Sequence, residues 1–185
     1  MKTRAQVPET WQALGLTGTA VEVGTYQGEF AQWILDHWPG QLIVVDRWRH
    51  DPNAHDILNH DQKDFEAVYQ ACVARLHPYA WRCEVLRKDS ADAARLYQRY
   101  RQQFDAIYLD ASHDYGSVMA DLVSWWPLVK DGGWFGGHDY LNGTMAEGFP
   151  ADFGVKQAVD EFAAAHGLEV STTTDDPFPT WWVFK

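Results

Sequence analysis

The chain has 185 residues, of which 46% are hydrophobic and 22% charged, a globular composition long enough for one domain with a sizeable core. Acidic residues outnumber basic ones by 26 to 15, and the resulting net charge of −11 repels phosphate backbones and disfavours a nucleic-acid partner. The N-terminus has no apolar signal-peptide core, and no apolar run approaches the roughly 20 residues that cross a bilayer. We therefore expect residues 1–185 to form a single cytoplasmic domain without a membrane partner.

Apolar runs typical of buried strands alternate with amphipathic stretches along the chain. In chain order the pattern predicts a strand at 20–24, a helix at 29–37, a strand at 42–46, a helix at 61–76, a strand at 85–86, a helix at 90–100, a strand at 104–110, a helix at 115–129, a strand at 132–139, a helix at 155–166, and strands at 168–173 and 180–184. Such alternation indicates an α/β fold, with a doubly wound, mostly parallel sheet covered on both faces. The last two strands predict a C-terminal antiparallel β-hairpin at one edge of the sheet.

The cysteines and most tryptophans are expected to serve packing rather than chemistry. Cys72 and Cys83 do not form a Cys-x-x-Cys pair, so we expect two reduced thiols. Of the ten tryptophans, Trp33, Trp125 and Trp126 fall on helix faces that point toward the predicted sheet.

Acids stand at the ends of all five strands predicted to be parallel. In a doubly wound sheet, ligands bind beyond the carboxyl ends of the strands, near the switch in strand order. The residues at these ends are Glu22, Asp46, Asp89, Asp110, and His138 with Asp139. Their positions predict one ligand site at this edge of the sheet.

The turn after the first strand reads Glu22-x-Gly24-Thr25-Tyr26-x-Gly28. Glycine at a strand-to-helix turn lets a ligand approach the backbone, and the helix N-terminus then presents free N–H groups. Tyr26 stands where the dinucleotide fingerprint needs a second glycine. The Glu22 carboxylate would repel a pyrophosphate and would suit a ligand that bears an ammonium group. A purely structural turn is the alternative.

Two further strand ends suit the other parts of a nucleoside. Asp46 stands where a carboxylate can accept both hydroxyls of a ribose, although an acid after a strand can also cap a helix or lie in solvent. Asp89 and Ser90 resemble a helix N-cap, and the same pair could bond an adenine edge.

Taken together, these residues resemble motif I, the ribose position and the adenine position of a class I S-adenosylmethionine (SAM)-dependent methyltransferase, over almost the whole chain. Two motifs, Asp110-x-x-His113-Asp-Tyr and Gly-Gly-His138-Asp139-Tyr, are similar to those of the small-molecule O-methyltransferase subfamily that includes macrocin-type enzymes. The resemblance implies SAM as cofactor, with Trp48 stacked on the base or covering the ribose. The cofactor-binding residues it implies are Glu22, Gly24, Thr25, Tyr26, Gly28, Asp46, Trp48, Asp89, Ser90 and Asp110.

The resemblance also implies a divalent cation, because macrocin-type and catechol-type enzymes hold one between the acid that ends strand four and two ligands that end strand five. Carried over by position, the metal ligands are Asp110, His138 and Asp139. His138 replaces a second acid of the macrocin-type enzymes. Magnesium prefers oxygen ligands, whereas imidazole suits manganese, zinc, iron or nickel, so Mg, Mn and other transition metals remain candidates.

Two histidines are candidates for the catalytic base that takes the acceptor proton, His113 and His138. His113 could instead fix the loop that follows strand four. Loops 47–59 and 141–153 are expected to act as lids over the acceptor. His50, His55 and His60, in the long loop after the second strand, lack a regular ligand spacing, which favours a solvated segment over a metal site.

The function implied by this resemblance is transfer of the SAM methyl group to a hydroxyl of a small-molecule acceptor such as a sugar, a phenol or a secondary metabolite. Two alternatives stay open: a non-catalytic ligand-binding module on the same fold, and a nucleotide-dependent oxidoreductase. The missing middle glycine and the terminal hairpin argue against the oxidoreductase. The tryptophan-rich surface would accommodate a homodimer.

Overall fold

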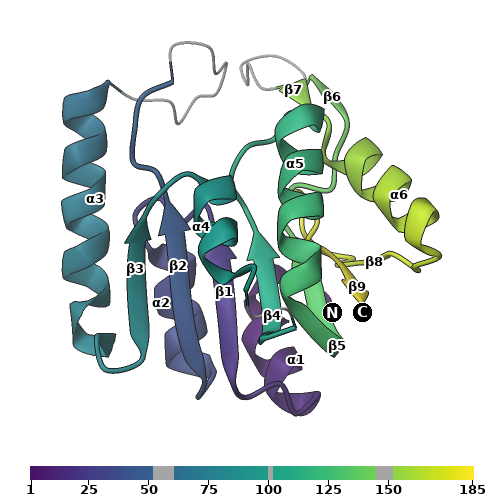
Figure 1. The fold of residues 1–185 in the computed structure, drawn as a ribbon, viewed down its shortest axis with the longest axis horizontal. Helices are drawn as coiled ribbons and strands as arrows, with labels where there is room; N and C mark the ends of the chain where they lie inside the picture. Colours follow the sequence, from purple (N-terminus) through teal and green to yellow (C-terminus); the bar gives the residue numbers. More distant parts are fainter. Residues whose placement is uncertain (52–60, 100–101, 145–151) are drawn as a thin grey trace.

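A computed structural model describes residues 1–51, 61–99, 102–144 and 152–185 (Figure 1). Seven strands form one sheet in the order β3-β2-β1-β4-β5-β9-β8. Strands β3, β2, β1, β4 and β5 are parallel, whereas β9 runs antiparallel to both β5 and β8. Their bounds are β1 Thr19–Val23, β2 Gln41–Asp46, β3 Cys83–Arg87, β4 Phe104–Leu109, β5 Val129–Gly137, β8 Ser171–Thr172 and β9 Trp181–Phe184. The predicted doubly wound sheet with antiparallel C-terminal strands is confirmed.

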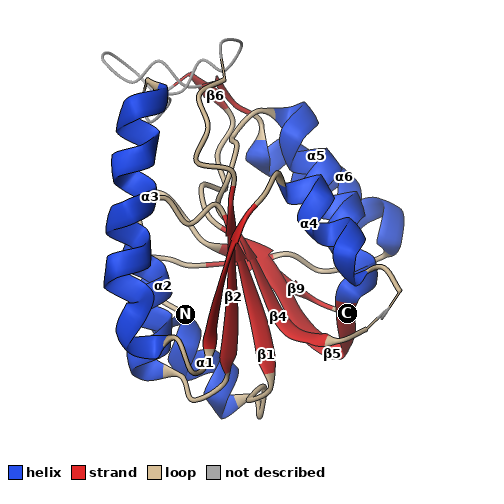
Figure 2. Ribbon diagram, turned by 60° about the vertical axis from the view of Figure 1, so that its left-hand side comes forward, coloured by secondary structure: helices blue, strands red, loops and turns tan. Residues whose placement is uncertain are grey.

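Six α-helices of the described residues cover the two faces of the sheet (Figure 2). On one face lie α1 Val7–Ala13, α2 Glu29–His37 and α3 Gln62–Leu76, and on the other lie α4 Ser90–Tyr97, α5 Tyr115–Trp125 and α6 Val155–His166. Short 3₁₀ helices are η1 Arg4–Gln6, η2 His77–Tyr79 and η3 Trp126–Leu128, and a separate two-stranded ribbon pairs β6 Gly143–Thr144 with β7 Asp152–Phe153.

Each central strand contributes side chains to two cores, which explains its continuous apolar sequence. Val21, Val23 and Ile107 face the core under α4, α5 and α6. Ala20 and Tyr108 point the opposite way, into the core under α1, α2 and α3. A sheet covered in this way offers a ligand only its strand ends, and those ends therefore define the site.

Several elements differ from the expectation. Helix α1 was not predicted, although Pro8 near its start and the i,i+4 pair of buried residues Val7 and Trp11 are helical signals. The helix expected at 115–129 ends at Trp125, two residues before Pro127, and continues as η3.

The side chain of Trp33 is 40% exposed, contrary to the expected core position, whereas Trp125 is fully buried as expected. Both cysteines are free thiols, in agreement with the sequence. Within the described part of the chain, no helix is both long and apolar enough to span a bilayer. Residues 52–60 and 145–151, including His55, His60 and most of the two expected lid loops, lie outside the described residues.

Candidate functional site

A cavity of about 690 Å³ opens at the carboxyl ends of the parallel strands, a volume typical of small-molecule sites. Most of the residues expected at the site line it, from the ends of all five parallel strands. They are Glu22, Gly24, Thr25, Tyr26, Asp46, Asp89, Ser90, Asp110, His113, His138 and Asp139. Within the described residues, the lining does not include Gly28 or Trp48.

Glu22, near the end of β1, is only 1% exposed. Burial raises the pKa of its carboxyl to about 8, although the charge of Arg4 acts in the opposite direction. Its Oε2 atom is buried and has no hydrogen-bond partner among the described residues. A buried acceptor without a partner is costly, and a ligand with an N–H donor would satisfy it.

Gly24 lets the loop after β1 contact the loop after β4. Its φ is +88°, and a Cβ placed on it would lie 2.0 Å from the carbonyl oxygen of Asp110. Its N–H donates to the Val45 carbonyl at 2.8 Å. A side chain at this position would push the strand ends apart, so the glycine is required by close approach as well as by φ.

The Asp46 carboxylate faces the cavity and also fixes the backbone around it. Its Oδ2 accepts hydrogen bonds from the N–H groups of Thr25 at 3.1 Å and Tyr26 at 2.9 Å, and its Oδ1 accepts from the N–H of Trp48 at 2.8 Å. Each carboxylate oxygen has two lone pairs, so Asp46 can still accept from a ligand hydroxyl. The structure thus adds a positioning role to the expected ribose contact.

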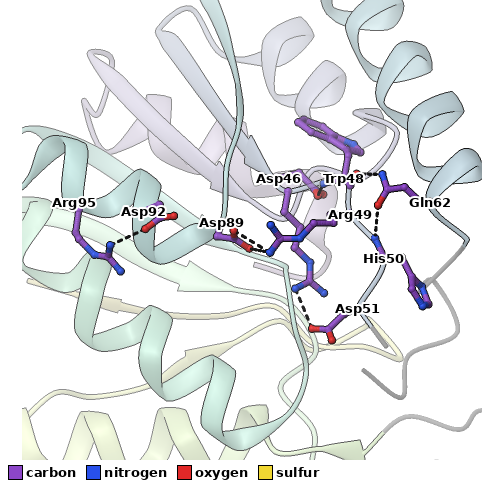
Figure 3. A network of polar contacts seen from close by, with 10 residues as sticks. Asp46, Trp48, Arg49, His50, Asp51, Gln62, Asp89, Asp92 and Arg95 are labelled. Carbon is purple, nitrogen blue, oxygen red and sulfur yellow. Dashed lines mark hydrogen bonds and ion pairs between the residues drawn. The ribbon is translucent and has the colours of Figure 1, made fainter. Parts of the chain in front are cut away.

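Asp89 and Ser90 line the cavity, but both side chains already have partners. Asp89 accepts two contacts from Arg49, at 3.0 and 3.1 Å, across the loops that follow β2 and β3 (Figure 3). The Ser90 hydroxyl donates to Asp121 Oδ1 at 2.5 Å and accepts from Trp125 Nε1 at 2.8 Å. Burial raises the pKa of Asp121 to about 6. Asp121 of α5 also lines the cavity, and no strand-end signal marked it in the sequence.

Two residues expected to touch the cofactor, Gly28 and Trp48, have packing roles in the structure and do not line the cavity. The Trp48 side chain is fully buried, donates from Nε1 to the Tyr26 carbonyl at 2.8 Å, and packs against Tyr69 with ring centroids 4.9 Å apart. Stacking on a base is therefore not available to it in this conformation. Gly28 is the N-cap of α2 with φ +78°, and its Cβ would lie 3.0 Å from Cys72 Sγ, so it permits the packing of α2 on α3.

His113, His138 and Asp139 form a hydrogen-bonded group beside Asp110. Asp139 Oδ2 lies 3.0 Å from His113 Nε2 and 3.2 Å from His138 Nδ1, and His138 Nδ1 lies 3.7 Å from Asp110 Oδ1. Burial alone would raise the pKa of Asp139, but the hydrogen bonds from the two histidines outweigh it and lower the pKa well below its usual range. An ionised Asp139 can thus orient both imidazoles.

The side chains that could hold a divalent cation differ in one member from the expected set. Ligand atoms of Asp110, His113 and Asp139 all lie within 4.8 Å of one another, so His113 takes the place that the resemblance gave to His138. His138 remains adjacent through its contacts with both carboxylates. Two carboxylates with an imidazole form a mixed oxygen–nitrogen donor set that fits a transition metal such as manganese, iron or zinc.

Arg4 also lines the cavity, and the sequence did not predict it. Its guanidinium donates from a terminal nitrogen to Asp110 Oδ2 at 2.6 Å and lies over the Phe30 ring at 3.8 Å. Arg4 and Asp110 are 106 residues apart, and nothing in the local sequence indicates that the N-terminal segment reaches the strand ends.

Backbone strain gathers at the same strand ends. Among the described residues, Tyr26, Trp48 and Asp139 are three of the four non-glycine residues with positive φ, at +50°, +41° and +56°. Such conformations cost roughly 1–3 kcal/mol each and are kept where surrounding contacts impose them, often at functional sites.

The strand order and the antiparallel C-terminal strands define a Rossmann-like methyltransferase fold. A family model described as a methyltransferase domain matches residues 21–140, well over half of the chain. The chain belongs to this methyltransferase domain family. The matched range contains every strand-end residue of the cavity and excludes Arg4.

Solved structures agree in fold over nearly the whole chain. An O-methyltransferase from Bacillus cereus in complex with SAH is 14% identical with a TM-score of 0.66, covering 98% of this chain and 80% of that one. The O-methyltransferase TomG from Streptomyces achromogenes, involved in tomaymycin synthesis and solved in complex with SAM, is 15% identical with a TM-score of 0.67, covering 98% and 79%. A protein from Corynebacterium glutamicum is 17% identical with a TM-score of 0.68, covering 100% and 82%. No curated protein matches the sequence.

Proposed function

We propose that the protein transfers the methyl group of SAM to a hydroxyl of a small-molecule acceptor. The observation that supports this most directly is the buried Glu22 carboxyl, which has one oxygen without a partner among the described residues and lies in the same cavity as Asp46. Together they suit the ammonium and the ribose of SAM. Two similar structures hold SAM or SAH, which supports the same cofactor here.

SAM would lie across the strand ends. Glu22 would bind its ammonium group, the Gly24–Tyr26 turn its amino-acid end, Asp46 its ribose, and the region of Asp89 and Ser90 its adenine. The sulfonium methyl is already electrophilic, so the main task of the protein is to align the acceptor oxygen for in-line attack. The motifs that contain His113 and His138 support a place in the small-molecule O-methyltransferase subfamily of macrocin type.

Proton removal from the acceptor would fall to a histidine held by Asp139. In the tautomers that donate to Asp139, His113 uses Nε2 and His138 uses Nδ1, so the second ring nitrogen of each is an acceptor. An imidazole whose partner is an ionised carboxylate is a suitable general base near neutral pH. Either histidine can fill this role.

A divalent cation fits the group formed by Asp110, His113 and Asp139, with His138 next to it. When bound, such a cation would act as a Lewis acid that lowers the pKa of an acceptor hydroxyl. Asp110 and Asp139 would supply oxygen ligands and His113 a nitrogen ligand.

Methyl transfer to a panel of catechols, phenols and sugars tests the proposal, with SAH and methylated product measured by mass spectrometry. The assay is run on protein treated with EDTA and on the same protein after addition of Mg²⁺, Mn²⁺ or Zn²⁺. We expect SAH to form in step with an O-methylated product for at least one acceptor. SAM binding without transfer to any acceptor would favour a ligand-binding module, and NAD binding without SAM binding would favour an oxidoreductase.

A further inference from the structure

The N-terminal segment fixes Arg4 at the mouth of the cavity. The backbone N–H of Arg4 donates to Asp176 Oδ2 at 2.6 Å, and the N–H of Asp175 donates to the Lys2 carbonyl at 2.9 Å. On the other side, Trp33 Nε1 of α2 donates to the carbonyl of Ala5 at 2.9 Å. Hydrogen bonds to both the β8–β9 turn and α2 hold the segment across the strand ends. The position of Arg4 is therefore fixed before a ligand binds.

The side chain of Arg4 is also oriented, yet its donors are not all used. Its guanidinium is stacked over Phe30 and donates to Asp110 Oδ2. The Nε atom is buried and has no hydrogen-bond partner among the described residues. A guanidinium has five N–H donors in a fixed plane, a geometry that matches a carboxylate. The side chain is 25% exposed, so a ligand in the cavity can reach it.

Arg4 and Glu22 bring a guanidinium and a carboxyl group to neighbouring strand ends of the cavity. Arg4 reaches Asp110 after β4, and Glu22 lies in the neighbouring strand β1; their charges influence each other. One offers a buried donor without a partner in the described part of the chain, and the other a buried acceptor in the same state. A guanidinium, together with a carboxyl that ionises when an ammonium binds, is complementary to the two charged groups of an α-amino acid.

The other cationic side chains that line the cavity are differently placed. Arg47 follows β2 and pairs with Asp51 at 3.1 Å, and Lys88 follows β3. In the sheet order β3-β2-β1-β4, both stand toward the end where the ribose and adenine are proposed to lie. Arg4 is therefore the cation best placed for the amino-acid end.

We propose that Arg4 binds the α-carboxylate of SAM, an inference that rests on the proposed function. The carboxylate accepts from terminal N–H groups of the guanidinium, because the Nε atom itself is buried, while Asp110 keeps its own contact with the side chain. Glu22 binds the neighbouring ammonium group. The N-terminal segment thereby becomes part of the cofactor site, outside the region that the methyltransferase family model matches.

Calorimetric titration with SAM and with its decarboxylated analogue tests this pairing. The two ligands differ by the carboxylate alone, and a charge-assisted hydrogen-bonded pair corresponds to roughly 10- to 100-fold in affinity. We expect the wild-type protein to prefer SAM by this factor. In Arg4→Met, which keeps an apolar stem over Phe30, we expect SAM affinity to fall and the preference to shrink to less than roughly threefold.

Arg47→Met is the matched control, because it removes another cation that lines the cavity and should leave the preference unchanged. A wild-type protein that binds both ligands equally would overturn the role of Arg4, whether or not the variant folds. So would an Arg4→Met protein that keeps the full preference. A wild-type protein that binds neither ligand would instead contradict the proposed function itself.

Discussion

Glu22 shows how one buried side chain restricts the choice of ligand. Its carboxyl is almost completely removed from solvent, and burial raises its pKa to about 8. The folded protein therefore holds a proton there near neutral pH, whereas an unfolded chain with a pKa of about 4.3 would not. Protonated Glu22 therefore makes its full contribution to stability below the pKa of the unfolded chain, and this contribution is lost as the pH rises through about 8. An ammonium ligand stabilises the carboxylate and lowers the pKa of Glu22 again.

SAM binding is therefore expected to release protons. Near pH 7, a group with a pKa of about 8 is mostly protonated, so up to roughly 0.9 proton should leave when the ammonium binds. Titrations in buffers with different ionisation enthalpies measure this number. Glu22→Gln should abolish the release and weaken SAM binding, whereas Glu84→Gln, an exposed acid on β3, should change neither. If SAM binding to Glu22→Gln still released protons, the protons would come from a group other than Glu22.

The pair of histidines on Asp139 leads to a second prediction. Replacement of the base by glutamine, as His113→Gln or His138→Gln, should lower kcat by roughly 10²- to 10⁴-fold, because no general base then takes the proton of the substrate hydroxyl. The affinity for SAM, measured by titration, should change by less than about threefold. His37→Gln, at the C-terminal end of α2 and outside the cavity lining, is the control. If neither histidine variant loses activity, the proton leaves by another route.

At the scale of elements, the β1–α2 turn connects the fold to the site. The Asp46 carboxylate holds the N–H groups of Thr25 and Tyr26, and Trp48 holds the Tyr26 carbonyl from behind. The turn is thus fixed by β2 and by the loop that follows it. Gly24 completes the arrangement because it permits contact with the end of β4.

Gly24→Ala should therefore destabilise the protein by about 3 kcal/mol or more, since it adds a backbone clash to the strain of a positive φ. Gly132→Ala is a matched control, because Gly132 has a similar φ of +78° but nothing within 4 Å of its added Cβ. The control should cost about 1 kcal/mol. Urea unfolding of both variants measures the difference, and equal losses would show that the close approach is unimportant.

The sequence predicts elements well where local signals agree. Glu29–His37 and Val155–His166 were predicted with their observed bounds, since Pro39-Gly40 stops the first helix and Gly167 stops the second. The strand ends at Asp46 and Asp110 followed from buried runs that stop at an acid, and the end of the first strand followed from the glycine turn at Gly24. The helix α1 was missed because its signals are short, and β6 and β7 because two-residue strands have no detectable period.

The side-chain partners within the site were less predictable. Trp48 follows Asp46 directly, yet whether its ring faces the cavity or the core depends on its φ of +41° and on packing against Tyr69. The choice of His113 over His138 as the third potential metal ligand depends on how the loops after β4 and β5 meet. Arg4 reaches Asp110 only through the folded path of the N-terminal segment. Such long-range contacts leave no local pattern.

At the scale of the whole molecule, charge and topology are consistent with one ligand. The chain has a net charge of −11, and every parallel strand brings an acid or a histidine–acid pair to the cavity. SAM has a sulfonium and an ammonium, which such a lining attracts, and one carboxylate, for which Arg4 is available. Along the sheet order β3-β2-β1, the residues proposed to bind the adenine, the ribose and the amino-acid end follow one another in the order in which these parts are joined in SAM.

The most direct test of this account is calorimetric titration with SAM, with and without prior EDTA treatment. Wild-type protein and Asp46→Ala are compared, with Asp92→Ala, an exposed acid on α4, as the control. We predict binding at one saturable site in the wild type and in the control, weakened at least roughly tenfold in Asp46→Ala because the ribose contact and the turn are both lost. Absence of saturable binding in the wild type, or equal affinity in Asp46→Ala, would contradict a SAM site at these strand ends.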